Sequence, residues 1–184
     1  NYWMIIKHFE VSKEKFDKHN FFLVYGENEG LKKEIIQALK KKFSGNVENY
    51  DEGQIISNSE LFFENLFNKS LFEKEKIIIV NRCSEKIYDV VEKIIDKKIS
   101  DTKIIFNFNI LEKRSKIRNL FEKDKELIIV PTYKDTSITL VEIAKKFFNN
   151  YKISISQETI NLLVSRCNGD RGHLKTELDK IQIY

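Results

Sequence analysis

The sequence predicts an α/β protein in which a parallel sheet with flanking helices is followed by a small unit of three helices. Short apolar runs alternate with segments of helical periodicity, which is typical of strands joined by helical crossovers. Several runs are apolar throughout, as strands buried on both faces are. After Pro131 these runs end and only helical patterns follow. We therefore expect an α/β domain over residues 1–133 and a helical lid domain over residues 134–184.

Five buried or half-buried strands are expected in the first domain. They are predicted at residues 21–26, 47–50, 77–80, 103–109 and 126–130, and a short edge strand is also predicted at 4–10.

Helices are expected between these strands. One runs from Glu29 to Phe43 and ends at Ser44-Gly45-Asn46. Ser57-Asn58-Ser59-Glu60 has the form of a capping box that opens a helix containing Leu61 and Leu66. Ser84 can cap a helix that runs to about Lys97, and a short charged helix is predicted at residues 113–122.

The lid is predicted to hold three helices. Thr139-Leu140-Val141-Glu142 is a second capping-box candidate, which leads into a helix that ends at Phe148. Ser156 caps the next helix. Asn168-Gly169-Asp170 breaks the chain, and a third helix follows from Arg171 to the end.

Composition narrows the possible partners. Charged residues make up 33% of the chain, both signs are mixed, and the net charge is +4, which permits nucleic-acid contact without requiring it. Two cysteines and three scattered histidines form neither a disulfide framework nor a metal-ligand spacing. No apolar run is long enough to cross a membrane, so no membrane partner is expected. We expect a cytoplasmic protein with reduced thiols.

The first strand leads into a loop at which a phosphate-binding P-loop would lie. A working P-loop reads G-x-x-x-x-G-K-[ST], where the lysine reaches the β- and γ-phosphates and the hydroxyl binds Mg²⁺. Here Gly26 and Gly30 are one residue too close, and Lys33, after Lys32, replaces the hydroxyl. Glu27 and Glu29 in the loop would repel an anion. We therefore expect no ATP binding and no cofactor.

Other parts of an ATPase site are also missing. A metal-binding carboxylate would follow the third strand, yet the residues there are Asn81-Arg82-Cys83. Asn107 and Asn109 end the fourth strand, where they are better explained as strand-end polar residues than as water-positioning groups. Arg171 is either a relic of a phosphate-sensing arginine or a plain helix start, and the second interpretation is favoured.

Four segments together resemble the delta subunit of the bacterial DNA polymerase III clamp loader. They occur in order over nearly the whole chain: Phe21-Phe22-Leu23-Val24-Tyr25-Gly26-Glu27-Asn28-Glu29, Asn68-Lys69-Ser70-Leu71-Phe72-Glu73-Lys74-Glu75-Lys76, Leu111-Glu112-Lys113-Arg114-Ser115-Lys116, and the lid end from Asn168 to Tyr184. The resemblance implies an AAA+-like fold that binds no ATP. It also implies a subunit of the DNA polymerase III holoenzyme, a nucleotidyltransferase complex, without catalytic activity of its own.

The resemblance further implies partners and a contact site. The partners are the sliding clamp (beta), which the subunit holds open at one ring interface, the other clamp-loader subunits, and primer–template DNA in the intact complex. The clamp contact maps to Leu71 and Phe72, with Ser70 before them. This pair has no obvious periodic place in the core, although it could instead fold inward as the lip of the sheet core. The family also has a C-terminal collar domain, which we expect this chain, ending at Tyr184, to lack.

Two other functions stay open from the sequence. One is a divergent P-loop ATPase that uses Lys32 or Lys33 on phosphates. The other is a sequence-independent DNA-binding scaffold, whose phosphate contacts would come from Lys13, Lys15, Lys18, Lys40, Lys41, Lys42, Lys97 and Lys98.

Overall fold

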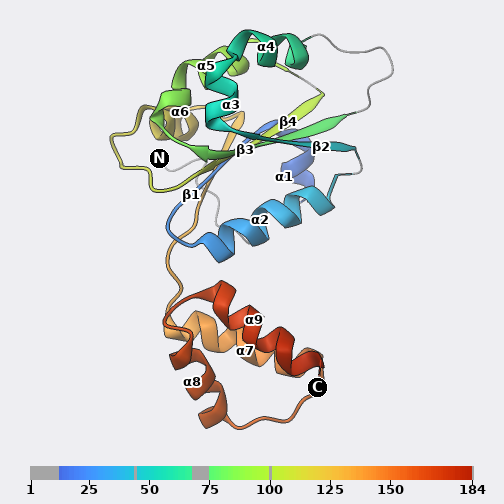
Figure 1. The fold of residues 1–184 in the computed structure, drawn as a ribbon, viewed down its shortest axis with the longest axis vertical. Helices are drawn as coiled ribbons and strands as arrows, with labels where there is room; N and C mark the ends of the chain where they lie inside the picture. Colours follow the sequence, from blue (N-terminus) through green and yellow to red (C-terminus); the bar gives the residue numbers. More distant parts are fainter. Residues whose placement is uncertain (1–12, 44, 68–74, 100, 184) are drawn as a thin grey trace.

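The computed structural model describes residues 13–43, 45–67, 75–99 and 101–183. Five parallel strands form one sheet in the order β2-β3-β4-β1-β5 (Figure 1). Their bounds are β1 Phe21–Tyr25, β2 Asn46–Asp51, β3 Lys76–Cys83, β4 Thr102–Phe108 and β5 Leu127–Pro131. The predicted α/β fold and these five strands are confirmed, whereas the strand expected at residues 4–10 lies outside the described residues.

Helices cover both faces of the sheet. Helices α1 (Lys13–Lys18) and α2 (Glu29–Lys41) pack on one face. The other face is covered by α3 (Glu52–Ser57), α4 (Ser59–Phe67), α5 (Tyr88–Asp96), which follows the short 3₁₀ helix η2 (Glu85–Ile87), and α6 (Lys116–Lys123). The sheet is therefore covered on both sides, which explains why β1 and β5 are apolar throughout, whereas the edge strand β2 is mostly polar and only partly buried.

The interior strand β1 shows how the two faces are built. Its side chains alternate, so that Phe22 and Val24 face α2, whereas Phe21, Leu23 and Tyr25 enter the opposite core. β1 pairs with β4 on one side and with β5 on the other. The carboxyl ends of these three strands lie at one edge of the sheet, from which the loop into α2 departs.

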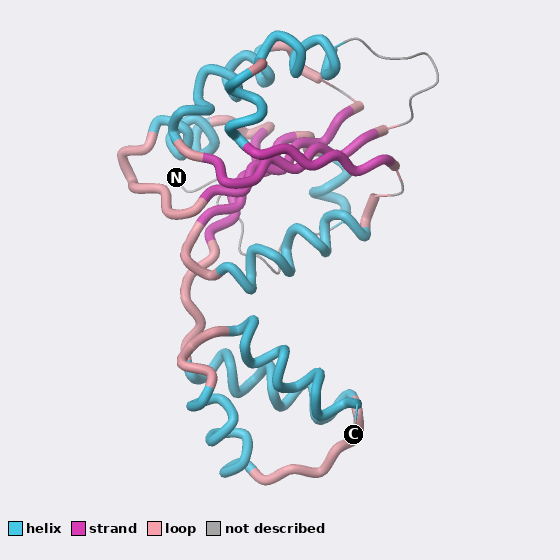
Figure 2. The backbone as a smooth tube through the Cα atoms, viewed as in Figure 1, coloured by secondary structure: helices cyan, strands magenta, loops and turns pink. Residues whose placement is uncertain are grey.

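The last three helices have an apolar core of their own. Helices α7 (Ser137–Asn150), α8 (Gln157–Arg166) and α9 (Arg171–Ile183) bury Leu140, Ala144, Phe148, Ile160, Val164, Cys167, Leu174 and Leu178 among themselves. Figure 2 shows this group beyond α2, connected to the sheet by the segment after β5. A domain division after residue 133 stays a prediction.

Several predicted helix starts need correction. The sequence analysis missed α3, and the cap of α4 is Asn58, whose Oδ1 accepts a hydrogen bond from the Leu61 amide (3.3 Å), rather than a serine. Helix α7 begins at Ser137, because Thr136 and Thr139 cap each other reciprocally; Thr139 is therefore inside the helix. The Ser156 cap is confirmed by its hydrogen bond from the Thr159 amide (3.1 Å).

Candidate functional site: the degenerate nucleotide loop

The loop that follows β1 lies at the carboxyl ends of β4, β1 and β5. Open parallel sheets bind ligands at this edge. The loop runs from Gly26 to Asn28, the N-cap of α2, and the helix begins at Glu29. The predicted residues Gly26, Gly30, Lys32 and Lys33 are therefore brought to the place where a nucleotide phosphate would bind in a protein of this topology.

Gly26 allows the loop to lie directly against the segment that follows β5. Its φ angle is +136°, and an added Cβ would lie 2.2 Å from the carbonyl oxygen of Thr132. Thr132 is fully buried and donates from its amide (2.7 Å) and its hydroxyl (2.9 Å) to the Tyr25 carbonyl. Only glycine combines this backbone conformation with so close an approach.

Several backbone amides of the loop and of the first turn of α2 are already hydrogen bonded within the chain. The Gly26 amide donates to Asn109 O (2.7 Å), the Asn28 amide to Thr132 O (3.3 Å) and the Leu31 amide to Asn28 Oδ1 (3.0 Å). A P-loop cradles phosphates with amides of this kind. A phosphate would therefore have to displace internal hydrogen bonds before it could bind to this loop.

The two adjacent lysines of α2 have different environments. Lys32 has 1% of its side chain exposed, and its Nζ donates to Phe108 O (3.0 Å) and pairs with Glu29 Oε1 (2.5 Å). Its ammonium is thus bound to the end of β4 instead of facing a ligand. Lys33 is exposed and lines a groove of ≈ 540 Å³ between α2 and α9.

The loop carboxylates lie on the solvent side of the site. Glu27 pairs with Lys134 (2.9 Å), and the Glu29 side chain is 71% exposed. Both predicted acidic residues therefore lie beside the loop, where their negative charge opposes the approach of a polyphosphate.

The ends of β3 and β4 are joined by neutral or paired groups. Asn107 Nδ2 donates to Asn81 Oδ1 (3.2 Å), and Arg82 pairs with Asp51. Among the described residues, no group of three or more His, Cys, Asp or Glu side chains could hold a metal ion. Burial also raises the pKa of the Cys83 thiol, which disfavours a reactive thiolate.

Arg171 is the first residue of α9, which confirms the favoured sequence interpretation of a helix start, and its side chain also makes ion pairs. Its Nε and Nη2 donate to Asp135 Oδ2 (2.8 Å) and Oδ1 (2.5 Å), and its Nη1 reaches Glu34 Oε2 (3.3 Å). Asp135 also accepts from Asn28 Nδ2 (2.8 Å). Sequence reasoning missed Asp135, because no periodicity or motif distinguishes it from the other carboxylates.

The electrostatic state of this pair follows from its contacts. Burial alone would raise the pKa of Asp135, but the hydrogen bonds from Arg171 and Asn28 outweigh burial and hold that pKa below its ordinary value. Burial alone would lower the pKa of Arg171, but the hydrogen bonds and charge of Asp135 raise it by more, so the pKa of Arg171 lies above its ordinary value. Both groups are therefore charged at neutral pH.

The predicted clamp-binding residues Ser70, Leu71 and Phe72 lie outside the described residues. The neighbouring described elements are α4, which ends at Phe67, and β3, which begins at Lys76.

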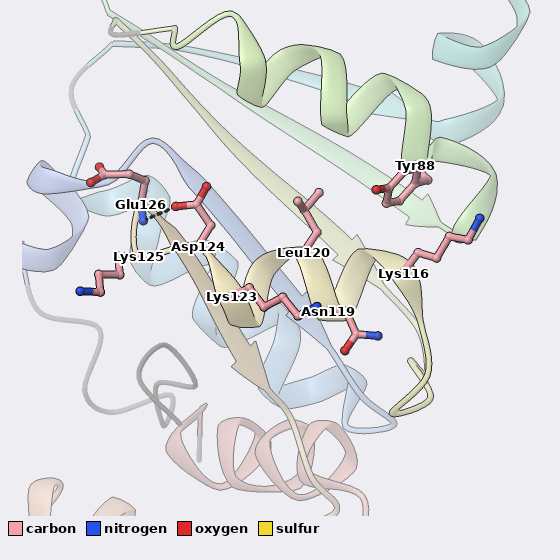
Figure 3. Close-up of a pocket in the computed structure, with 8 residues that line it drawn as sticks. All are labelled: Tyr88, Lys116, Asn119, Leu120, Lys123, Asp124, Lys125 and Glu126. Carbon is pink, nitrogen blue, oxygen red and sulfur yellow. Dashed lines mark hydrogen bonds between the residues drawn. The ribbon is translucent and has the colours of Figure 1, made fainter. Parts of the chain in front are cut away.

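A separate groove of ≈ 740 Å³ lies along α6 (Figure 3). Tyr88 from α5 and Leu120 from α6 line it, together with Lys116, Asn119, Lys123, Asp124, Lys125 and Glu126. It contains charges of both signs, and Asp124 is engaged by the Glu126 amide (2.9 Å). The lining of this groove therefore favours neither an anionic nor a cationic ligand.

Comparison with known proteins identifies the fold. No protein-family model matches the sequence, and a search of curated proteins finds no match either. Among solved structures, the DNA clamp loader delta protein (YqeN) of Bacillus subtilis superposes with a TM-score of 0.59 at 16% identity, over 92% of this chain and 54% of that one. The chain has an AAA+-type fold.

Two further structures support this assignment. Domain III of the replication initiation protein DnaA from Thermotoga maritima gives a TM-score of 0.56 at 12% identity, covering 96% of this chain and 80% of that domain. A RuvB variant from Thermotoga maritima gives 0.54 at 12% identity, covering 94% of this chain and 57% of that one. The chain thus spans little more than half of the clamp loader delta and RuvB chains. The predicted likeness to clamp loader delta is confirmed at the level of the fold.

Within the described residues, no helix is both long enough and apolar enough to span a membrane.

Proposed function

We propose that this chain is a non-catalytic clamp-loader subunit of the delta type. It binds a sliding clamp and holds one ring interface open, so that the ring can be loaded on primed DNA during replication. The observation that carries the proposal is that groups of the nucleotide loop are bound within the chain: Lys32 donates to Phe108 O, and the amides of Gly26 and Asn28 donate to Asn109 O and Thr132 O. A protein with this fold and this loop does its work through a binding surface.

The proposed mechanism is a difference in binding free energy. A ligand shifts a ring from closed to open only to the extent that it binds the open form more tightly. The subunit would therefore contact a clamp surface whose shape changes when the interface opens. No ATP is needed for that contact, and Gly26, Gly30, Lys32 and Lys33 have no nucleotide-binding role in this proposal.

The proposed contact residues are Leu71 and Phe72, with Ser70 before them. Burial of each apolar side chain in a clamp pocket would contribute roughly 1.5–3 kcal/mol. Contributions of this size are typical of the few residues that dominate an interface.

The proposed partners follow from the same role. They are the sliding clamp, the other clamp-loader subunits within a DNA polymerase III holoenzyme, and primer–template DNA in the assembled complex. The proposed location is the cytoplasm.

Titration with a bacterial sliding clamp tests the contact. The Leu71→Ala/Phe72→Ala double variant is expected to bind at least about 100-fold more weakly than the unmodified chain, because the free energy of burying both apolar side chains is lost. A matched control, Ile138→Ala/Leu162→Ala, removes two lid side chains that are 71% and 52% exposed and is expected to bind normally. Equal affinity of the Leu71/Phe72 variant and the unmodified chain would refute the contact.

The described geometry favours neither alternative function. For a divergent ATPase, Lys32 is buried and its ammonium is bound to the Phe108 carbonyl at the end of β4. For a DNA-binding scaffold, Lys40, Lys41 and Lys42 lie at the end of α2 on one face of the sheet, whereas Lys97 and Lys98 follow α5 on the other. These lysines do not form one phosphate-binding surface.

A further inference from the structure

Four hydrogen bonds converge on the carboxylate of Asp135. The donors are Asn28 Nδ2 (2.8 Å), Arg171 Nε (2.8 Å) and Nη2 (2.5 Å), and the Thr139 hydroxyl (3.2 Å), whose one hydrogen is shared with the nearer Thr136 carbonyl (2.9 Å). The side chains of Asp135 and Arg171 are only 4% and 9% exposed. Asp135 is therefore a buried anion, and both of its carboxylate oxygens accept hydrogen bonds.

The donors come from three separate helices. Asn28 caps α2, Thr139 lies in the first turn of α7, and Arg171 begins α9. Helix N-termini carry partial positive charge and stabilise anions. The shell thus has the composition of a phosphate site, and one of its walls is the loop that would cradle a phosphate in a working P-loop.

Further contacts join α9 to α2. Arg171 and Lys175 both reach Glu34 (3.3 and 2.7 Å), and Gly30 approaches Gly172 so closely that an added Cβ would lie 3.0 Å from the Gly172 amide nitrogen. The groove between α2 and α9 is lined mainly by polar and charged residues. Asp135, which precedes α7, adds a bridge between the two helices, because it accepts hydrogen bonds both from Asn28 at the start of α2 and from Arg171 at the start of α9.

We propose that Asp135 is an internal substitute for a bound phosphate: it occupies an anion site built by Asn28, Thr139 and Arg171 and keeps the C-terminal helices docked on the nucleotide loop without any ligand. In this arrangement the lid position is permanent, since the anion is part of the chain. The inference concerns lid placement and does not depend on clamp binding.

Anion rescue tests the proposal. In Asp135→Ser the carboxylate is removed and space is left in the donor shell, so the midpoint of thermal unfolding is expected to fall by roughly 4–10 °C. Inorganic phosphate is expected to restore it in a saturable manner, whereas chloride at equal ionic strength does not. In Asp135→Asn the side-chain amide fills the site, so phosphate is expected to leave the midpoint of thermal unfolding unchanged. This variant replaces Asp135→Ser in the experiment if the serine variant does not fold.

Two controls separate the site from general salt effects. Asp135→Ser/Arg171→Met removes the cation as well and is expected to show no rescue. Glu112→Ser removes a carboxylate that is paired with Arg114 at the surface, where both side chains are well exposed, and it should respond equally to phosphate and chloride. Equal responses of Asp135→Ser to the two anions would overturn the proposal.

The position of the C-terminal helices relative to the sheet can be measured directly by double electron–electron resonance between spin labels. Spin labels at Glu60→Cys on α4 and Lys146→Cys on α7 report it, because both positions are exposed and the natural cysteines are buried (5% and 1% exposed). A narrow distance distribution is expected for the otherwise unmodified chain, a broad one for Asp135→Ser, and a narrow one again after phosphate is added. An Asp135→Ser distribution as narrow as the reference would contradict the proposal.

Discussion

The sheet core and the junction between α2, α7 and α9 are held together by different forces. Around β1 and β4 the contacts are apolar: Phe22, Leu23 and Phe106 are completely buried among aliphatic and aromatic side chains. At the junction, Asp135 and Arg171 are almost as deeply buried, yet they interact through directional, charged hydrogen bonds. The difference separates what determines the fold from what determines the placement of the lid.

Apolar burial is non-directional and depends on area, whereas a buried ion pair depends on geometry and on the charge of each partner. The core should therefore respond mainly to changes in volume. The junction should respond to pH and to the loss of a single donor or acceptor. Four substitutions test this contrast, in decreasing order of expected effect.

Phe106→Ala should have the largest effect. Phe106 is fully buried in β4 and packs edge-to-face on Phe121, with ring centroids 6.1 Å apart. Truncation should lower the free energy of unfolding by about 3–5 kcal/mol, because a large cavity is left in a packed core. Urea unfolding measures this loss, and Ile110→Ala, at a side chain that is 64% exposed, should change little.

Gly26→Ala tests the close approach of the loop to the end of β5. The added methyl group would meet Thr132 O at 2.2 Å, and φ is +136°. Strain and overpacking together should cost about 2–4 kcal/mol. Gly53→Ala in α3, where nothing lies within 4 Å, should instead be neutral or stabilise by up to about 1 kcal/mol through helix propensity. Similar unfolding curves for the two variants would disprove the packing at Gly26.

The adjacent lysines of α2 provide a third test. Lys32→Met should cost about 1–3 kcal/mol, because the buried Phe108 carbonyl loses its donor. Lys33→Met, at an exposed position one residue later, should change the free energy of unfolding by less than about 0.5 kcal/mol. If Lys33→Met were the more costly change, the assignment of the two side chains would be wrong.

The pH dependence of the junction should be the smallest effect. The folded-state pKa of Asp135 lies below its ordinary value, so its stabilisation is fully present above the unfolded pKa of about 3.9 and is lost as pH falls through the folded pKa. Its charged and polar neighbours are Arg171, Asn28 and Thr139, with Glu34 beyond Arg171.

The measurement compares Asp135→Asn with the unmodified chain. The difference in their free energies of unfolding should be constant near neutral pH and should shrink in acid. A difference that grows as the pH is lowered would have the wrong sign for a depressed carboxylate pKa.

The same contrast explains which features could be predicted from sequence. Strands β1, β3, β4 and β5 were predictable because each contains an apolar run that signals burial whatever its neighbours are, whereas the mostly polar strand β2 has no such run. The Ser156 cap was predictable because its partner, the Thr159 amide, is local. The start of α7 was misplaced because Thr136 and Thr139 both suit a cap and only the reciprocal bonds identify which one leads. The short helix α3 has too few residues for a clear period.

The junction could not be predicted for a different reason. The chain contains 32 Lys and Arg and 28 Asp and Glu residues, and local spacing does not show which of them meet in space. Asp135 and Arg171 are 36 positions apart. The degeneracy of the loop was visible in the spacing of Gly26 and Gly30, but the burial of Lys32 against Phe108 was not. The clamp-contact residues 70–72 rest on the family resemblance and stay a prediction.

The central claim is that this chain works by binding a clamp and needs no nucleotide to do so. Titration of a bacterial sliding clamp with the chain, with and without ATP and Mg²⁺, tests it most directly. The account predicts saturable binding whose dissociation constant is the same within about twofold in both conditions, because the nucleotide loop is filled by the protein itself. Absence of saturable binding, or binding that ATP tightens by the about 5–150-fold typical of coupled sites, would contradict the account.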